Sequence, residues 1–437
     1  MYMTWGASKH TLVTLKQWLE QLPVDVMHAR PQLCLASALL LFQVAPYSLL
    51  EGWLDVAEGT LTAVLSMQTD EDSLSSMSIQ ENLFGAVIGL RAVLRKYEGD
   101  GQAALKLSQR ALTLVSPENL AVRAQIVLGQ AGVFSGTSLN DAVTAVETGL
   151  QAISLAQATG QSGLIIIAMG STAIDMIGTG QLHKACRLTQ QAIELGKQSE
   201  EHMLPEVGLS TALQALILCV WNELDGALAL AEEAISLCQQ GESLASLTYV
   251  AHAYAILLHI SLSRGNLEVA RTTFQEFERI GIQMNQPLYL EVCSHFITID
   301  QVRLWLACDE LDRAMRWVEE LDIGERHGTP FAHEREEMAR VRLLLAMSQP
   351  DLALQRLEPV LQRATAGQRW GHMIEIRLLQ ALAYQMSQKE TQALDALSEA
   401  LRLAEPEGYI RSLKEFRWLL YSPGCEKSNA KLGQPPT

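Results

Sequence analysis

Glycine and proline are scarce in this sequence, with 29 and 13 residues among 437. Folds made of many short strands need tight turns, and these two residues supply them. Their scarcity therefore favours long helices over short strands. The chain is 48% hydrophobic and 19% charged, which is typical of a folded protein and not of a disordered one.

The chain also has fewer basic than acidic residues, and its cysteines do not stand in close pairs. The chain has 33 Lys and Arg against 49 Asp and Glu, which gives a net charge of −16. Nucleic-acid binding needs a basic face, so we expect no direct DNA binding by this chain. No two of the seven cysteines stand two to four residues apart, so a zinc site is not predicted. Unpaired cysteines in apolar runs favour a reducing compartment, the cytoplasm.

Motifs that bind nucleotides or catalyse reactions are missing. A phosphate-binding loop needs Gly-x4-Gly-Lys-Ser/Thr, and the only Gly-Lys pair, Gly196-Lys197, is followed by Gln198. A Gly-x-Ser-x-Gly nucleophile motif is absent, and His333-Glu-Arg-Glu-Glu337 lacks the second histidine of a zinc protease. The apolar run Leu33–Phe42 is about half the ~20 residues that a bilayer span requires. We therefore expect no enzyme activity, no cofactor, no ATP, no metal and no membrane span.

An internal repeat is the most informative feature that is present. Glycine or a small polar residue is followed by Leu two positions later and by Ala three positions further on. The clearest copies have their alanine at Ala185, Ala227, Ala270 and Ala314, and weaker copies have it at Ala104, Ala142, Ala353 and Ala393. Seven intervals separate the first of these alanines from the last, so one repeat averages about 41 residues, which is within the range of helical-hairpin repeats. A further N-terminal copy has Ser48 in this place.

Each repeat reads as a helix–turn–helix hairpin. An apolar stretch precedes the motif, and a stretch with apolar residues at i, i+3, i+4 and i+7 follows it. One hairpin cannot bury its own apolar face, so neighbouring hairpins stack into a superhelix. The sequence thus predicts an all-α, TPR-like α-solenoid, a right-handed superhelix of about nine repeats. We expect a lead-in helix over 1–30, the repeats over 31–418 and a disordered tail over 419–437.

Segments at both ends carry a specific resemblance. Leu15–Pro23 and Ala29–Cys34 near the start, with Leu378–Tyr384 and Ala400–Arg411 near the end, resemble the helical-repeat region of large MalT-like (LuxR-type) transcriptional activators. The resemblance covers roughly residues 10–416. It implies a sensor superhelix that binds an inducer or a regulatory protein, which in that family follows an ATPase module and precedes a DNA-reading domain.

The resemblance predicts a non-enzymatic regulatory or sensor module. Residues 1–437 contain neither the ATPase module nor the DNA-reading domain, so we expect this chain to bind neither ATP nor DNA unaided. An alternative is a free-standing TPR scaffold that binds a protein or peptide partner and has no role in transcription.

Candidate ligand-binding residues come from aligning the repeats on their alanines. The helix positions at offsets −18 and −11 from the alanine share one helix face, which lines the concave groove of TPR-like hairpins. They are apolar in the first four aligned units. In the next three they are His252 and His259, Phe296 and Arg303, and Arg335 and Arg342. Arginine forks suit carboxylate or phosphate, so this set predicts a site for an anionic effector or an acidic peptide, with binding that weakens as the histidines lose charge.

Two alternatives to this site remain open at the level of sequence. The six side chains could form a solvated face, with arginine stems covering apolar surface. A rival polar column lies at offset −13 from the alanine, and it could line the groove or form interhelical hydrogen bonds. This column comprises Arg91, Thr172, Gln214, Gln301, Arg340 and Gln380.

Overall fold

The structure is a computed structural model, and it describes residues 14–15, 17–19, 21–41, 47–67, 74–136, 139–199, 204–241, 244–284, 287–323 and 330–421. In these ranges the chain forms helices and turns and no strand. The prediction of an all-α solenoid is confirmed. Of the predicted tail over 419–437, residues 419–421 lie in the last helix and 422–437 lie outside the described residues. The expected domain bounds stay predictions.

The helices after α3 (Val24–His28) pair into nine consecutive hairpins within the described ranges, as the repeat count predicts. The pairs are α4 (Pro31–Leu41) with α5 (Tyr47–Met67), α6 (Leu74–Tyr97) with α7 (Gly101–Leu114), α8 (Leu120–Gly136) with α9 (Ala142–Thr159), α10 (Ser162–Gly178) with α11 (Leu182–Gln198), α12 (Leu204–Val220) with α13 (Leu224–Cys238), α14 (Leu244–Ser263) with α15 (Leu267–Met284), α16 (Pro287–Ala307) with α17 (Leu311–Ile323), α18 (Pro330–Ala346) with α19 (Pro350–Ala366) and α20 (Trp370–Met386) with α21 (Glu390–Ala404). A 3-10 turn, Glu405–Glu407, and helix α22 (Ile410–Tyr421) follow.

One residue with positive φ lies in the turn of each hairpin from α6–α7 to α20–α21, and it ends the first helix. These residues are Gly99, Asn140, Gly180, Asn222, Gly265, Asp309, Ser348 and Gln388. In every unit a small alanine lies five positions later. In the α8–α9 unit this alanine is the fully buried Ala145, so the predicted anchor Ala142 is wrong by three positions. Ala142 only begins α9, where the Asp141 side chain accepts a hydrogen bond from the Thr144 N–H.

The hairpins form an inner and an outer layer. Each even-numbered helix from α4 to α20 packs against the next even-numbered helix, whereas in the described residues the successive odd-numbered helices from α5 to α21 have no comparable contact. The inner helix α10 is consequently buried without interruption from Gly163 to Gly170. The outer helix α11 buries residues such as Leu182, Ala185 and Thr189 along one stripe, which is the helical period.

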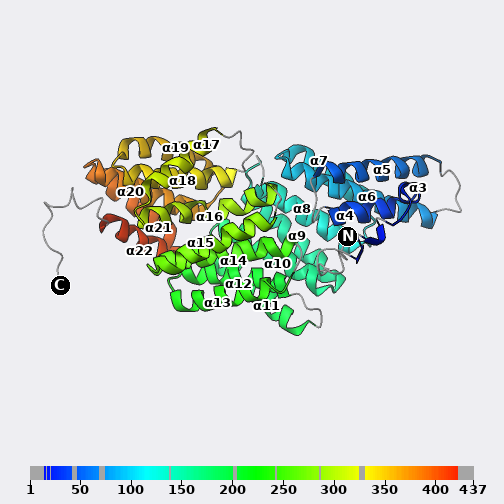
Figure 1. Cartoon of the computed structure of the whole chain (residues 1–437), viewed down its shortest axis with the longest axis horizontal. Helices are drawn as coiled ribbons and strands as arrows, with labels where there is room; N and C mark the ends of the chain where they lie inside the picture. The colour runs from blue at the N-terminus through cyan, green and yellow to red at the C-terminus, as the bar shows by residue number, and fades with distance from the viewer. Residues whose placement is uncertain are drawn as a thin grey trace.

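The later helices close on themselves. Helix α8 contacts α18, α10 contacts α20, and α12 contacts α22. We call helices α8 to α22 the ring, and helices α3 to α7 the N-terminal stack. Figure 1 shows the stack at one end of the molecule and the later helices gathered at the other. The stack has its own apolar core, which reaches only as far as Ile126 in α8.

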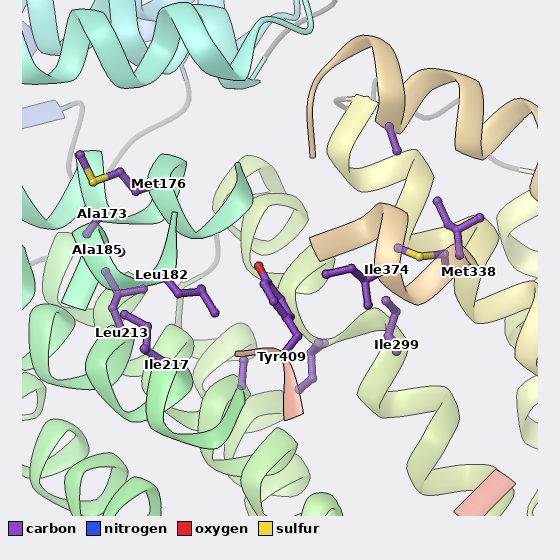
Figure 2. Close-up of a cluster of buried hydrophobic side chains, with 14 of the residues drawn as sticks. Ala173, Met176, Leu182, Ala185, Leu213, Ile217, Ile299, Met338, Ile374 and Tyr409 are labelled. Atoms are coloured by element: carbon purple, nitrogen blue, oxygen red, sulfur yellow. The ribbon is translucent and has the colours of Figure 1, made fainter. Parts of the chain in front are cut away.

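A tyrosine fills the seam where the ring closes. Tyr409 is 6% exposed and belongs to the main apolar core. In Figure 2 its side chain lies between Leu182, Leu213 and Ile217 on one side and Ile299 and Ile374 on the other. The seam thus joins helices that are far apart in the sequence through one shared core.

Helix α14 contains a stretch, Ser246–Ser263, that is long and apolar enough to cross a membrane by length and composition alone. Neighbouring helices bury 67% of this stretch. It packs against both α12 and α16 in the inner layer. We interpret it as a core helix, because burial on both sides accounts for its composition.

Candidate functional site

Four of the six predicted site residues come together on the inner helices of the ring. His259 lies on α14, Arg303 on α16, and Arg335 and Arg342 on α18. Protein surrounds the side chains of His259 and Arg303, but both keep some exposure to solvent. The exposed fraction is 25% for His259 and 18% for Arg303. They therefore lie on an inner wall that solvent reaches.

A carboxylate that the column analysis did not include connects two of these residues. Asp300 on α16 accepts from His259 Nδ1 at 3.1 Å and from Arg303 Nη1 at 2.7 Å. Asp300 is 3% exposed. A buried carboxylate needs such partners, because ionisation without them is strongly unfavourable.

The electrostatics of this trio follow from its pairing. Burial opposes ionisation of Asp300, but the neighbouring charges of His259 and Arg303 outweigh it and hold the pKa of Asp300 below its usual range. Burial likewise opposes protonation of His259, and Asp300 outweighs it and raises the pKa of His259 well above its ordinary value. All three groups are therefore ionised at neutral pH, and His259 Nδ1 donates to Asp300.

The arginines of α18 face a second carboxylate. Arg342 Nη2 lies 2.6 Å from Glu375 Oε1, and Glu375 belongs to α20. Burial opposes ionisation of Glu375, and the charges of Arg342 and Arg335 keep its pKa below the usual range. The negative charge of Asp300 also favours the protonated form of Arg335. The inner wall is thus one network that crosses α14, α16, α18 and α20.

Helix α22 adds the last members of this network. Glu415 Oε1 lies 3.0 Å from Arg303 Nη2 and 3.1 Å from Arg411 Nε. We call the whole set the inner network: His259, Asp300, Arg303, Arg335, Arg342, Glu375, Arg411 and Glu415. Five of its members are cationic and three are carboxylates, which leaves an excess of two positive charges.

Of the other two predicted residues, His252 bonds to its own helix. His252 is 8% exposed, and its Nδ1 lies 2.8 Å from the Thr248 carbonyl of its own helix. Burial lowers the pKa of His252, although the bond to Thr248 opposes this. The two histidines thus differ, because burial lowers the pKa of His252 whereas Asp300 raises that of His259. The expected weakening of binding as the histidines lose charge stays a prediction. The side chain of Phe296 lies outside the described residues.

The rival polar column mostly contacts its own or a neighbouring helix. Arg91 Nη2 lies 2.7 Å from Asp55 on α5, and Thr172 Oγ1 donates to the Ala168 carbonyl of its own helix. Gln380 accepts from Arg377 at 3.0 Å. Arg340 is 8% exposed and lies beside Glu337, while Gln214 and Gln301 are half-buried. Of the two roles considered for this column, the interhelical one fits Arg91.

Column reasoning found four of the five cations of the network and assigned none of its three carboxylates to the site. Glu375 stands in the −18 column of its unit, but it was not assigned to the site. Asp300 lies four positions after Phe296 and three before Arg303, so it shares their helix face. That spacing could have identified it. Glu415 and Arg411 lie beyond the last repeat, and no column includes them.

A second buried charge cluster holds the seam of the ring. Glu334, which is fully buried, accepts from Arg369 Nε and from His372 Nδ1, both at 2.7 Å. Arg369 also donates to the Asn140 side chain across the seam. The charges of Glu334 and Arg369 balance each other, so we interpret this cluster as structural.

The chemistry of the inner network is that of paired ions with two neighbouring polar groups. The Ser263 hydroxyl donates to Glu415, and Cys219 is hydrogen-bonded to His259. In the described part of the chain no group of three His, Cys, Asp or Glu could hold a metal ion. What the arrangement can do is bind a charged partner.

Comparisons with known proteins agree with this architecture. The family model described as the MalT-like TPR region matches residues 85–415. The HTH-type transcriptional regulator MalT of Klebsiella pneumoniae subsp. pneumoniae is 23% identical over 412 residues, and that of Cronobacter sakazakii is 24% identical over the same length. Each alignment covers 93% of this chain and 42% of the relative, so the chain spans less than half the length of these curated relatives.

A solved structure shares the fold. The crystal structure of a Rap protein complexed with Competence and Sporulation Factor superimposes with a TM-score of 0.59 at 12% sequence identity. The match covers 86% of this chain and 98% of the Rap chain. Together, the repeat, the superhelical fold and the family match over most of the sequence lead to one assignment: the chain belongs to the family of MalT-like TPR regions.

Proposed function

We propose that this chain is a non-enzymatic, cytoplasmic regulatory module whose ring binds an anionic effector or an acidic peptide on its inner wall. Such a module would serve as the sensor of a LuxR-type regulator. The residues that would contact the ligand are His259, Arg303, Arg335 and Arg342. ATP and DNA would be bound by other modules or chains.

The observation that carries this proposal is the excess of positive charge in the inner network. The whole chain has a net charge of −16, so a cationic inner wall runs against its average. Charges on a concave wall of low polarizability act on a ligand more strongly than the same charges on an open surface. Arginine forks also match carboxylate and phosphate geometry.

The relatives support a regulatory role at a coarser level. MalT is named as an HTH-type transcriptional regulator, and the Rap protein was solved in complex with a factor. Both names concern those proteins. They support a role for this superhelix as a sensor that responds to a bound partner.

Binding of charged probes tests the proposal. The full chain is titrated in low salt with tetraglutamate and, separately, with tetralysine. We expect tetraglutamate to bind and tetralysine to fail. Arg342→Gln should weaken tetraglutamate binding at least tenfold, because a charged hydrogen bond contributes about 1.5–3 kcal/mol.

A matched control separates the site from general charge. Arg402 on α21 is exposed and paired with Glu399, so Arg402→Gln removes the same charge far from the inner network. This variant should bind tetraglutamate as the native chain does. Equal weakening in both variants, or no binding by the native chain, would contradict the proposal.

A further inference from the structure

Helix α22 reaches into the ring with a carboxylate. Glu415 Oε1 accepts hydrogen bonds from Ser263 Oγ and, at 3.1 Å, from Arg411 Nε, and it pairs with Arg303 Nη2 at 3.0 Å. Ser263 ends α14 and Arg303 lies on α16, so two of these three donors belong to the ring wall. A single carboxylate oxygen is therefore bound in a site that other helices build.

The wall keeps this site in shape from its own side. Arg303 uses Nη1 for Asp300, at 2.7 Å, and Nη2 for Glu415. His259 is held by the same Asp300. Because Asp300 fixes the guanidinium and the imidazole, the donors stay aligned whether or not Glu415 is present. Two of the three donors, Ser263 and Arg303, thus belong to the wall, whereas Arg411 belongs to α22 itself.

Within residues 410–415, whose side chains the structure describes, apolar burial contributes little to the attachment of α22. Among its described side chains, residues 410–415, none is buried, and Ile410 is 47% exposed. Leu413 is the one apolar side chain of this range that packs partly against the core. Helix α20, by contrast, buries nine residues, among them Ile374, Ile376 and Leu378. Polar contacts to Glu415 and Arg411 are the principal described attachment of α22 to the wall.

The residues before α22 are attached differently. Trp221 Nε1 donates to the Glu407 carbonyl, and the His183 N–H donates to the Glu407 carboxylate, both at 2.9 Å. With the buried Tyr409, these contacts fix the chain up to the start of α22. Release of Glu415 would therefore free the helix while its N-terminal end stays fixed at the seam.

We propose that Glu415 is an internal occupant of a carboxylate-binding site, and that a carboxylate-bearing effector binds by taking its place on Ser263 and Arg303 and so releases α22. This proposal rests on the proposed function, since it assigns the ligand class and the response to the same inner wall. The C-terminal helix becomes the element that reports whether the ring is occupied.

Competition sets the affinity that a ligand needs. A tethered group has an effective concentration in the millimolar range. A simple monocarboxylate must therefore exceed millimolar concentrations to displace Glu415. A ligand with a second acidic group that reaches Arg335 or Arg342 gains a further charged contact and competes at lower concentration.

Glutarate, a small dicarboxylate, serves as the probe, and Glu415→Gln of the full chain is the main variant. The variant keeps the shape of the side chain and removes its charge. We expect glutarate to bind the variant at least tenfold more tightly than the native chain. Hydrogen exchange should show residues 410–421 exchanging at least fivefold faster in the variant without ligand. In the native chain, saturating glutarate should produce the same acceleration.

Glu399→Gln is the matched control, because Glu399 pairs with Arg402 on the outer helix α21. It should bind glutarate and exchange as the native chain does. Ser263→Ala provides a second route that keeps every charge: it removes one donor to Glu415 and should accelerate exchange of residues 410–421 several-fold. Unchanged exchange in Ser263→Ala, or equal glutarate affinity in Glu415→Gln and the native chain, would overturn the proposal.

The outcomes also separate this proposal from the proposed function. If glutarate or tetraglutamate binds in a manner that depends on Arg342 while α22 stays protected, the wall is a binding site and Glu415 is not its competitor. If no anionic probe binds the native chain or Glu415→Gln, both proposals fail.

Discussion

The N-terminal stack and the ring are built from the same hairpin but differ in which helices contact one another. In the stack, ion pairs join consecutive helices, as between Arg91 and Asp55 or between Arg95 and Glu51, which are 44 residues apart. In the ring, hydrogen bonds join residues as distant as Asn140 and Arg369, which are 229 apart. The stack is an open solenoid, whereas the ring is closed.

This difference determines how a perturbation spreads. The stability of an open solenoid is approximately a sum over neighbouring repeats, so a change in one unit stays local. Closure adds contacts between distant units, and a change at one of them alters the whole ring. Because the inner network and the seam share helices α18, α20 and α22, binding on the wall is able to influence closure.

The largest effect is expected from Arg369→Ala, which opens the seam of the ring. Arg369 is 4% exposed, and its loss leaves the fully buried Glu334 with His372 alone. Removing one partner of a buried ion pair costs about 3–5 kcal/mol. Hydrogen exchange should therefore show lost protection throughout helices α8 to α22 and native protection in α4 to α7.

Arg402→Ala is the control for this experiment, because the Arg402 side chain is 66% exposed. Exposed pairs contribute about 0–1 kcal/mol, so protection should hardly change. If Arg369→Ala lowered protection equally in the stack and the ring, or in neither, the two regions would not differ as the contacts indicate.

Three glycines allow a finer test, since they occupy the same turn position in different surroundings. Gly99 in the stack has φ +83° and open space, and so has Gly265 in the ring, with φ +75°. Gly180 at the seam has φ +72°, but an added Cβ would lie 2.7 Å from Trp370 Cβ. The three positions share one backbone conformation and differ in the contact.

Alanine at each of these positions should therefore separate strain from the seam contact. Left-handed backbone costs an alanine about 1–2 kcal/mol, and the overlap at Gly180 adds about 1–2 kcal/mol. Thermal unfolding should rank Gly180→Ala as the least stable, with Gly99→Ala and Gly265→Ala nearly equal. Three equal losses would mean that the turn next to Trp370 yields without opening the ring.

The sequence predicts the repeat and not the closure, for a physical reason. Period, turn residues and buried alanines are local, and each unit repeats them, so nine hairpins follow from spacing alone. In the unit at Asn140 the sequence alignment used Ala142 in place of the true anchor. The structure places Ala145 at the anchor position, five residues after the residue with positive φ. The position at which the ring closes depends on the total rotation of the hairpins along the superhelix. The sequence of one repeat does not determine this total.

The candidate site shows the same division. The column of His259, Arg303, Arg335 and Arg342 follows from helix geometry within each unit, and the structure places these four together. The sequence columns did not predict Glu415, because it lies beyond the last repeat. It reaches Arg303 only through the position of α22. The repeated helix face predicts which residues line the wall, whereas closure decides what occupies it.

The last test concerns pH and one buried carboxyl of the ring. Glu206 on α12 is 5% exposed, and burial raises its pKa to about 7, although a backbone hydrogen bond opposes the shift. Burial raises the pKa of Cys238 on α13 and of Tyr249 on α14, and the charge of Glu206 adds to both shifts. The titratable groups on which this carboxyl acts are thus a thiol and a phenol, and both are neutral at pH 7.

The sign of the effect follows from the two states of the chain. An unfolded glutamate has a pKa of about 4.3, so folding resists ionisation of Glu206 between there and about pH 7. The penalty is absent below about pH 4 and complete above about pH 7. Glu206→Gln removes it and should raise the free energy of unfolding by about 3–4 kcal/mol more at pH 8 than at pH 4.

Urea unfolding of the two proteins at both pH values measures this difference, and hydrogen exchange assigns it to helices α8 to α22. The control is Glu399→Gln, because a hydrogen bond from Arg402 lowers the pKa of Glu399 and its charge is not penalised. That variant should gain no stability at pH 8. If Glu206→Gln gained equally at both pH values, the benefit would come from packing and not from a buried charge.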